Sequence, residues 1–370
     1  MGNFNNRIRV GIIGVDPVRG WASIAHIPAI KALPQYDLVA ISNRNADKLL
    51  EAGKSFQVDQ LFTDSSELIT SADIDLVVVT VKVQYHKELV TAILDAGKQV
   101  FCEWPLGNGL VEAIDMTNLI RQKKLFGAVG LQARFVPAIT YIKDLVREGY
   151  IGEVLSTTLV GSGIIQGETI EEAFAYAADS RNGAGMIYST LANAVDALCY
   201  CLGEFESLNA TTATRRKEIV IRETGITIPM TSFDQVAFTG ILQSGTVASV
   251  HYRGGMFRGT NFYWEIIGTN GELVITAAGG HPGVFELTIR SVQGNGIPLE
   301  NLVVPDAYYL INSIPRHSPA FNLAHNYIRI AKDLLEGTHL SASFDDALIR
   351  HKMINAIEVS GSTGMRENYL

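Results

Sequence analysis

Residues 10–22 read VGIIGVDPVRGWA, and this stretch sets the organisation of the chain. Its apolar run ends at Ile13 and is short enough for a buried strand, and Gly14 follows directly. A helix is expected at 24–33. A glycine turn between a first strand and a first helix lets main-chain N–H groups and the helix dipole meet a pyrophosphate. The stretch is therefore a candidate dinucleotide-binding turn, although a purely structural turn would use the same glycines.

The same alternation of strand and helix continues to residue 131. Further strands are expected at 38–42, 76–81, 100–102 and 127–131, with helices at 46–56, 87–96 and 110–123 between them. Repeated βαβ units with short links predict a doubly wound parallel sheet, whose ligands bind at the carboxyl ends of the strands. The candidate cofactor-binding residues at those ends are Gly14, Asp16, Arg19, Trp21, Asn43, Arg44, Thr80, His86, Glu103 and Gln132.

The chain changes character after residue 131. Helices are expected at 137–148, 185–202, 321–335 and 344–360, and strands at 154–161, 237–242, 246–252, 263–267, 272–276 and 287–292. Asn270-Gly271 and Gln243-Ser244-Gly245 are hairpin signals. We therefore expect an α/β dinucleotide-binding domain of the Rossmann type at 1–131. An α+β substrate and oligomerisation domain is expected at 132–370, with an open, mostly antiparallel sheet covered by helices on one face.

Composition excludes several classes of protein. The 370 residues carry 30 basic and 38 acidic side chains, and 47% of them are hydrophobic, which excludes a disordered chain. The acidic balance argues against binding nucleic acid or an anionic membrane, and no apolar run reaches the roughly 20 residues of a membrane helix. The polar start of the chain shows no secretory signal, and three cysteines are too few for a disulfide framework. We expect a cytoplasmic protein with core thiols and no metal site.

The candidate cofactor site departs from the usual dinucleotide pattern in two places. Asp16 stands where a second glycine is expected, and Arg19 could compensate by reaching a phosphate. The second strand ends in Asn43 and Arg44, where NAD sites usually carry an acidic residue and NADP sites an arginine. The pattern favours NADP, with NAD and a merely solvated Arg44 as the alternatives.

Residues 97–106, GKQVFCEWPL, give the chain a more specific resemblance. Together with His86, the Arg134 region, 149–154 and 182–185, they resemble the glucose–fructose oxidoreductase / inositol dehydrogenase / rhizopine-catabolism family over essentially the whole chain. The loop ending in Gly20, residues 26–30 (HIPAI), Glu103-Trp104 and 130–134 (GLQAR) resemble the subgroup of the fungal galactose-regulon repressor. The resemblance implies the two-domain fold, a nicotinamide cofactor and pairing of the second-domain sheets into homodimers or homotetramers.

The resemblance also shows which catalytic groups are replaced. Dehydrogenases of the family use a lysine after the Glu103 position and an Asp and a His on the long helix. Trp104 stands at the lysine position, Ser189 at the Asp position and Asn193 at the His position. Neither an indole nor an amide titrates near neutral pH, so neither acts as a general base. Asp196 matches a further family position.

Other side chains could take over part of the chemistry. Arg134 could bind an acidic or carbonyl group or form an interdomain salt bridge, and Tyr188 could donate a proton or pack in the core. His86 could lie near the nicotinamide or act as a loop histidine, while the Glu103 position is more structural than catalytic in the family. The candidate catalytic residues are Trp104, Tyr188, Asn193 and Arg134.

Three functions remain open from the sequence. The first is an NAD(P)-dependent oxidoreductase acting on a sugar-like or other carbonyl or hydroxyl compound through this modified site. The second is a non-catalytic dinucleotide-binding regulator that contacts a protein partner, and the third is a lyase or isomerase on the same scaffold. The identity of any substrate is not encoded in these motifs.

Overall fold

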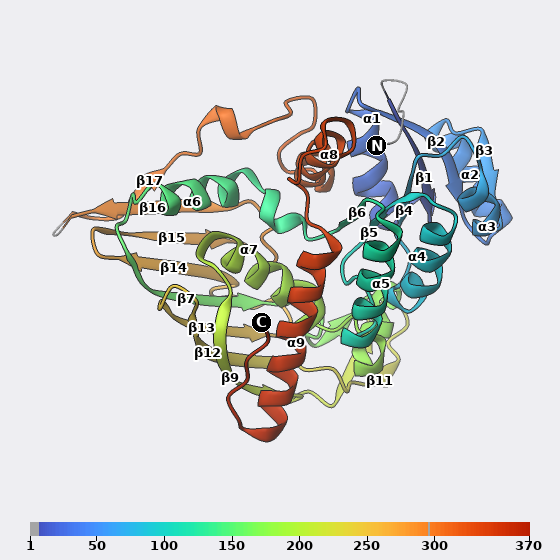
Figure 1. Ribbon diagram of the computed structural model, residues 1–370. Helices are drawn as coiled ribbons and strands as arrows, with labels where there is room; N and C mark the ends of the chain where they lie inside the picture. The colour runs from blue at the N-terminus through green and yellow to red at the C-terminus, as the bar shows by residue number, and fades with distance from the viewer. Residues whose placement is uncertain (1–6, 295–296) are drawn as a thin grey trace. The chain divides into compact units, whose positions relative to one another are not determined.

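The chain forms two compact units, which the computed structural model describes over residues 7–294 and 297–370. The first unit comprises the residues up to Gln132 together with Leu310–Leu348, and the second comprises Ala133–Tyr309 and Ile349–Leu370. Figure 1 traces the chain through both. The first six residues, on which the expectation of a cytoplasmic protein partly rests, lie outside the described residues.

The first unit is built on a parallel sheet with the strand order β3-β2-β1-β4-β5-β6. β4 is buried at every residue because helices cover both faces of such a sheet. The order reverses beside β1, which is the crevice where doubly wound sheets bind ligands. The strands are β1 (Ile8–Ile13), β2 (Tyr36–Ser42), β3 (Gln60–Phe62), β4 (Leu76–Val79), β5 (Gln99–Cys102) and β6 (Gly127–Val129).

The helices of the first unit follow the strands, and one returns from late in the chain. α8 (Pro319–Glu336) begins at the cap residue Ser318 and ends at Gly337, which has a left-handed backbone (φ 73°). Its Tyr327 is fully buried against Tyr36 of β2. The others are α1 (Ile27–Lys31), α2 (Ala46–Phe56), α3 (Ser65–Thr70), α4 (His86–Asp95) and α5 (Leu110–Lys123), with the π-helical turn Ala22–His26 before α1.

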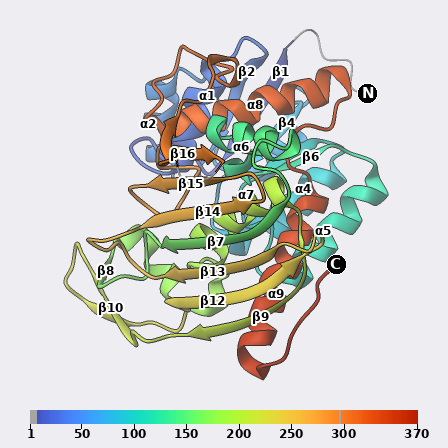
Figure 2. The same cartoon turned by 90° about the vertical axis from the view of Figure 1, so that its left-hand side faces the viewer.

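The second unit is built on a mixed sheet with the order β17-β16-β15-β14-β7-β13-β12-β9, shown in Figure 2. Only the β7–β13 pair is parallel among the described pairings of this sheet. The strands are β7 (Val154–Ser162), β9 (Phe205–Ala213), β12 (Gln235–Leu242), β13 (Val247–Arg253), β14 (Phe262–Gly268), β15 (Gly271–Ala277), β16 (Thr288–Gln293) and β17 (Glu300–Leu302).

Helices cover one face of this sheet, and the alternation of side chains follows from that. α6 (Pro137–Arg147) and α7 (Ala192–Leu202) lie over the face seen toward the viewer in Figure 1, and α9 (Phe344–Thr363) ends within this unit. Along β13, Tyr252 is buried and His251 is exposed, as expected for a sheet with one covered face. A small sheet of β8 (Thr169–Ile170), β10 (Glu218–Ile221) and β11 (Thr227–Pro229) is separate.

The structure confirms the predicted fold class and both hairpins. The β12–β13 and β14–β15 pairs are antiparallel and flank the two predicted turns. Strands β3, β8, β9, β10, β11 and β17 were not expected from the sequence. The division of the chain also differs from a single cut at residue 131, since Leu310–Leu348 lies in the first unit. Over the described ranges, every helix is too short or too polar to cross a lipid bilayer.

Candidate functional site

The turn after β1 brings two strand ends into close contact at Gly14. Gly14 has a φ of 100°, and a Cβ at this position would lie 2.8 Å from Val81 Cγ1 and 3.2 Å from the Thr80 carbonyl oxygen. The Thr80 N–H and hydroxyl both donate to the Ile13 carbonyl, at 3.1 and 2.8 Å. Only glycine satisfies this backbone and this spacing. The chain therefore leaves β1 as a close-packed turn of the kind that lets the backbone approach a pyrophosphate.

In the loop that follows, the Asp16 carboxylate accepts hydrogen bonds from the main chain and forms an ion pair. Its Oδ1 accepts from the N–H groups of Val18 and Arg19, each at 3.1 Å, and its Oδ2 pairs with Lys48 Nζ at 2.8 Å. Partial burial would raise the pKa of the Asp16 carboxyl, but the hydrogen bonds from Lys48 and the two N–H groups lower it overall. The negative charge is therefore held in place. The Arg19 side chain is exposed beside it.

Asn43 fastens the end of β2 to the end of β1. Its Nδ2 donates to the Val15 carbonyl at 2.6 Å, and its Oδ1 accepts from the Asn45 N–H at 2.9 Å. Both ends of the amide are thus used within the protein. The Arg44 guanidinium lies over the ring of Tyr85, 5.2 Å from its centroid, which presents a cation beside an aromatic face at this edge.

His86 braces the loops that follow β4 and β5. It is almost fully buried, with Nδ1 2.9 Å from the Pro105 carbonyl and Nε2 2.9 Å from the Val81 carbonyl. Burial lowers its pKa, so the ring is neutral near pH 7. Cys102 Sγ lies 3.3 Å from Nδ1, and burial raises the pKa of this thiol. The geometry gives His86 a positioning role.

Glu103 is held at the end of β5 by a residue of the first helical segment. His26 is fully buried, with Nε2 2.9 Å from Glu103 Oε1 and Nδ1 2.7 Å from the hydroxyl of Tyr327. A Cβ at Gly130 would lie 2.7 Å from Glu103 Oε2, so the glycine leaves room for this carboxylate. No sequence motif indicated the contact with Tyr327, which belongs to α8.

Five buried polar side-chain atoms of the first unit lack a partner among the described residues, and two of them belong to predicted cofactor-binding residues. These two are the indole Nε1 of Trp21, which precedes the helical segment, and Oε1 of Gln132, which follows β6. A buried donor or acceptor left unpaired is rare unless water or a ligand completes it. With the Gly14 turn, these atoms fit a dinucleotide lying along the strand ends. Trp104 is 9% exposed and offers an indole donor.

In the second unit, the residues that replace the family's Asp and His lie in the π-helical turn Ile187–Leu191 and at the start of α7. The Ser189 hydroxyl donates to the Gly185 carbonyl at 3.1 Å, and Asn193 Nδ2 donates to the Ser189 carbonyl at 3.0 Å. Asn193 Oδ1 is buried and has no partner among the described residues. An acceptor of this kind can receive a hydrogen bond from a hydroxyl ligand, but it does not titrate.

Arg134 is committed to an ion pair inside the second unit. It binds Asp196 at two points, Nε–Oδ2 2.6 Å and Nη2–Oδ1 2.8 Å. Arg350 also binds Asp196, with Nε 3.2 Å from Oδ1, and its Nη2 lies 2.7 Å from Glu204 Oε1. These side chains form a buried network in which charges of opposite sign alternate. The interdomain salt bridge considered from the sequence is thus an ion pair within one unit.

Tyr188 has a titratable partner that the sequence did not reveal. Its hydroxyl lies 3.4 Å from Glu358 Oε2 of α9. Burial and the neighbouring Glu358 raise the pKa of Tyr188, and burial raises that of Glu358. The second unit therefore holds a hydroxyl and a carboxyl group that are hydrogen-bonded to each other and that both keep their protons to a higher pH than usual. A separation of 170 residues explains why no motif pointed to this pair.

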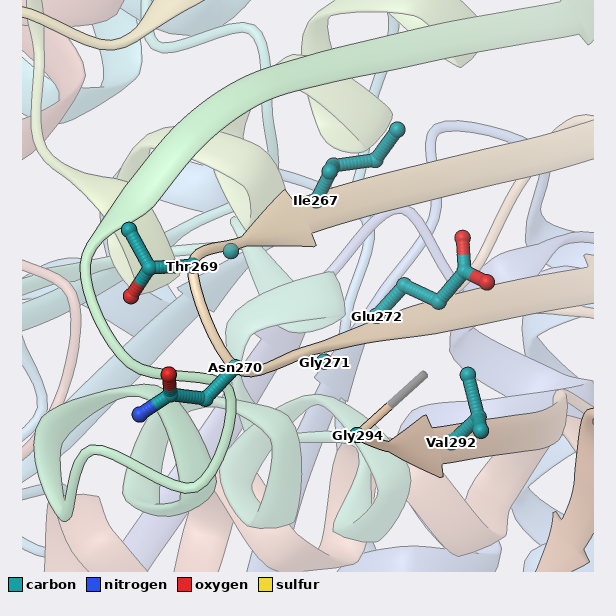
Figure 3. Close-up of a pocket in the computed structure, with 8 residues that line it drawn as sticks. Ile267, Thr269, Asn270, Gly271, Glu272, Val292 and Gly294 are labelled. Atoms are coloured by element: carbon teal, nitrogen blue, oxygen red, sulfur yellow. The ribbon is translucent and has the colours of Figure 1, made fainter. Parts of the chain in front are cut away.

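Two surface hollows of the second unit lie away from these groups in the fold. One of about 490 Å³ opens beside the β14–β15 hairpin, where Figure 3 shows Thr269, Asn270 and Glu272 at its edge. Another of about 350 Å³ lies on the sheet over β7, β9, β12 and β13. Neither is lined by a residue predicted to bind cofactor or act in catalysis. Among the described residues, no three His, Cys, Asp or Glu side chains gather as a metal site.

Known protein families match a segment of each unit. Residues 8–131 match the family model described as an oxidoreductase family with an NAD-binding Rossmann fold, and residues 137–277 match that of the Gal80p C-terminal domain. Dehydrogenase aclE of Aspergillus oryzae is 26% identical over 99% of both chains. The galactose/lactose metabolism regulatory protein GAL80 of Kluyveromyces lactis is 29% identical over 78% of this chain and 68% of its own.

Solved structures share the fold over nearly the full length. The transcriptional regulator Gal80p of Kluyveromyces lactis superposes with a TM-score of 0.86 at 24% identity, covering 98% of this chain and 91% of its own. Levoglucosan dehydrogenase in complex with NADH and levoglucosan gives 0.84 at 22% identity, covering 98% and 99%.

These matches define a protein with an NAD-binding Rossmann domain joined to a Gal80p-type C-terminal domain. The chain belongs to the glucose–fructose oxidoreductase / inositol dehydrogenase / rhizopine-catabolism family, near its Gal80-like subgroup.

Proposed function

We propose that this protein is an NAD(P)-dependent oxidoreductase acting on a sugar-like or other carbonyl or hydroxyl compound. The observation that carries the proposal is the Gly14 turn, where a positive φ and a 2.8 Å approach to Val81 leave room only for glycine. Such a turn brings main-chain N–H groups to a pyrophosphate. The full-length similarity to dehydrogenase aclE supports the same conclusion.

The chain's own residues orient the substrate and hold its proton. The cofactor supplies the hydride chemistry when it is bound. Asn193 Oδ1, which is buried without a partner among the described residues, accepts a hydrogen bond from the substrate hydroxyl. When a carbonyl compound is reduced, the Tyr188 hydroxyl gives its proton to the substrate oxygen and is reprotonated from solvent by way of Glu358, whose Oε2 lies 3.4 Å away. Arg134 acts as a positioning residue through Asp196.

Arg44 directs the preference toward NADP. It follows β2, where no carboxylate repels a 2′-phosphate, because Asn43 is neutral and is used in two main-chain hydrogen bonds. A guanidinium binds a phosphate through parallel hydrogen bonds. The remaining cofactor contacts in the proposal come from Gly14, Arg19, Trp21, Thr80, His86, Glu103 and Gln132.

A second function is favoured by one specific observation. Trp104 and Asn193 replace the titratable groups of the family's dehydrogenases, and acid–base help supplies about 10²–10⁴-fold in rate. A dinucleotide-binding regulator that contacts a protein partner needs no such groups. The match of residues 137–277 to the Gal80p C-terminal domain supports this alternative.

The open face of the large sheet supports a homo-oligomer. Outward-facing residues of β12 and β13 include exposed Ile241 and Val247 beside Thr239 and His251. Apolar side chains on an open sheet face are covered when two copies pair. Light scattering of the purified protein gives its mass; a monomer at micromolar concentration would rule out this assembly.

The test begins with equilibrium binding. Nicotinamide fluorescence and calorimetry measure binding of NADPH and of NADH, and we expect micromolar binding with NADPH tighter. A screen of carbonyl compounds under single-turnover conditions then follows loss of nicotinamide absorbance. Binding without oxidation of any compound would favour the regulator, and no binding in either oxidation state would defeat the oxidoreductase proposal.

A further inference from the structure

The carboxylate of Asp16 is held in the way that a loop holds a bound anion. Three donors converge on it: the N–H groups of Val18 and Arg19 at 3.1 Å on one oxygen, and Lys48 Nζ at 2.8 Å on the other. Two main-chain N–H groups and an ammonium are the donor set of many phosphate sites. In this chain the set is filled by a side chain of the same loop.

We propose that the Asp16 carboxylate stands in for a phosphate of the dinucleotide, and that Lys48 with the Val18 and Arg19 amides forms the phosphate-binding cradle. Cofactor binding then displaces Asp16 and transfers its three donors to the incoming phosphate. Nothing in the motif pattern assigns Lys48 to the site. The inference rests on the proposed function, since it requires that a dinucleotide enters this loop.

The local fold places Lys48 at the loop. Asn43 Nδ2 binds the Val15 carbonyl at 2.6 Å, which fastens the end of β2 to the start of the loop. Asn45 then caps α2 by accepting from the Lys48 N–H at 3.0 Å, so Lys48 lies in the first turn of that helix. Its side chain is 46% exposed and can swing toward an incoming ligand while its backbone stays fixed.

The charge balance at this edge favours a further anion. Asp16 and Asp47 contribute two negative charges, while Lys48, Arg19 and Arg44 contribute three positive charges around the two strand ends. An ammonium has three donors, so Lys48 can keep its place when a phosphate replaces a carboxylate. The cost falls on Asp16, whose negative charge repels the incoming phosphate. The wild-type loop therefore binds dinucleotides more weakly than its donors allow.

The Asp16→Asn variant separates the charge from the loop geometry. Asparagine Oδ1 still accepts from the Val18 and Arg19 amides, so the turn is retained, while the ion pair with Lys48 is lost. We expect affinity for NADH and for NADPH to rise roughly tenfold or more, as for release of one hydrogen bond to a charged group. Adding Lys48→Met to Asp16→Asn should remove most of that gain.

The measurement is nicotinamide fluorescence titration with NADH and NADPH, supported by calorimetry. Asp47→Asn is the matched control, because Asp47 is an exposed carboxylate on the same helix turn and carries the same charge change. We expect it to change affinity less than about twofold, as for an exposed, screened charge. An unchanged thermal midpoint shows that each variant is folded, and Asp16→Ser provides a second variant if Asp16→Asn is not.

The outcomes separate this inference from the proposed function. If Asp16→Asn binds both cofactors more tightly, the cradle holds the pyrophosphate that they share. If it binds only NADPH more tightly, the cradle holds the 2′-phosphate. Both results support the proposal. If Asp16→Asn binds a cofactor and the wild-type protein binds none, the phosphate-binding cradle is supported and the proposed oxidoreductase function of the wild-type protein is disproved. If Asp16→Asn binds no tighter than Asp47→Asn, or no protein binds either cofactor, the proposal is overturned.

Discussion

Arg134 grips Asp196 at two points, with Nε 2.6 Å from Oδ2 and Nη2 2.8 Å from Oδ1. The carboxylate is fully buried, and Arg350 approaches the same Oδ1 at 3.2 Å. One buried anion therefore balances two buried cations, with Glu204 supplying the second negative charge through Arg350. Breaking such a network leaves a charge in a medium that cannot solvate it.

Replacing Asp196 by asparagine should be among the most costly substitutions in the second unit. We expect Asp196→Asn to lower the free energy of unfolding by about 3–5 kcal/mol, because both arginines lose their shared counter-charge. Urea unfolding followed by circular dichroism measures the loss. The control is Asp345→Asn, which breaks the exposed pair with Arg121 and should cost less than about 1 kcal/mol. Equal costs for the two variants would contradict the role given to the network.

The carboxyl of Glu204 should make stability depend on acid pH. Burial would raise its pKa, but the charge of Arg350 and hydrogen bonds from Arg350 and Tyr369 lower it overall. A native pKa below the unfolded value of about 4.3 gives stability that is present above that value and lost as pH falls through the native pKa. Urea unfolding between pH 7 and pH 3 should show the deficit of Glu204→Gln shrinking below about pH 4.3. A deficit that is constant with pH would disprove the assignment.

Glu358 should make stability depend on pH in the opposite direction, with its contribution lost as pH rises. Burial raises its pKa, only partly offset by the hydrogen bond from Tyr188, so the native state holds the proton more tightly than the unfolded chain. This contribution to stability is present below about pH 4.3 and is lost as pH rises through the native pKa. Relative to wild type, Glu358→Gln should therefore be more stable at pH 8 than at pH 4. Tyr188→Phe is the control, since it removes the hydroxyl but keeps the ionisable carboxyl and hence the pH dependence.

Two glycines of the first loop allow crowding to be separated from backbone strain. Gly14 and Gly20 have φ values of 100° and 103°, but a Cβ would clash only at Gly14, because nothing lies within 4 Å at Gly20. Gly20→Ala should cost about 1–3 kcal/mol from the positive φ alone. Gly14→Ala should cost more and should abolish dinucleotide binding, as measured by urea unfolding and nicotinamide fluorescence. Equal effects would show that strain, not close approach, makes Gly14 necessary.

Much of the fold could be predicted from local sequence because its signals are local. Apolar runs such as 76–79 and turns such as Asn270-Gly271 determine strands and hairpins through neighbouring residues alone. Strands of two to four residues such as β3 and β17 carry too few side chains to show a period. The π-helical turns at Ala22–His26 and Ile187–Leu191 depend on packing and left no signal.

The site was harder to predict, because its contacts join distant residues. The sequence directed attention to the strand ends of the Rossmann sheet, where the structure places Gly14, Asn43, Thr80 and Glu103. Partners such as Lys48 for Asp16, 32 residues away, depend on how the strand ends meet in three dimensions. Tyr327 reaches His26 across 301 residues, which no spacing rule covers.

The return of Leu310–Leu348 to the first unit has a consequence for biosynthesis. His26 and Tyr36 emerge from the ribosome early, but the Tyr327 side chain that closes over them is made roughly three hundred residues later. Domains of nascent chains usually fold as units from the N-terminus. Here the first unit lacks the helix that carries Tyr327 until residues 133–309 of the second unit have been translated. Nascent chains stalled before α8 should therefore depend on chaperones, and protease resistance of the first unit should appear only after release of the complete chain.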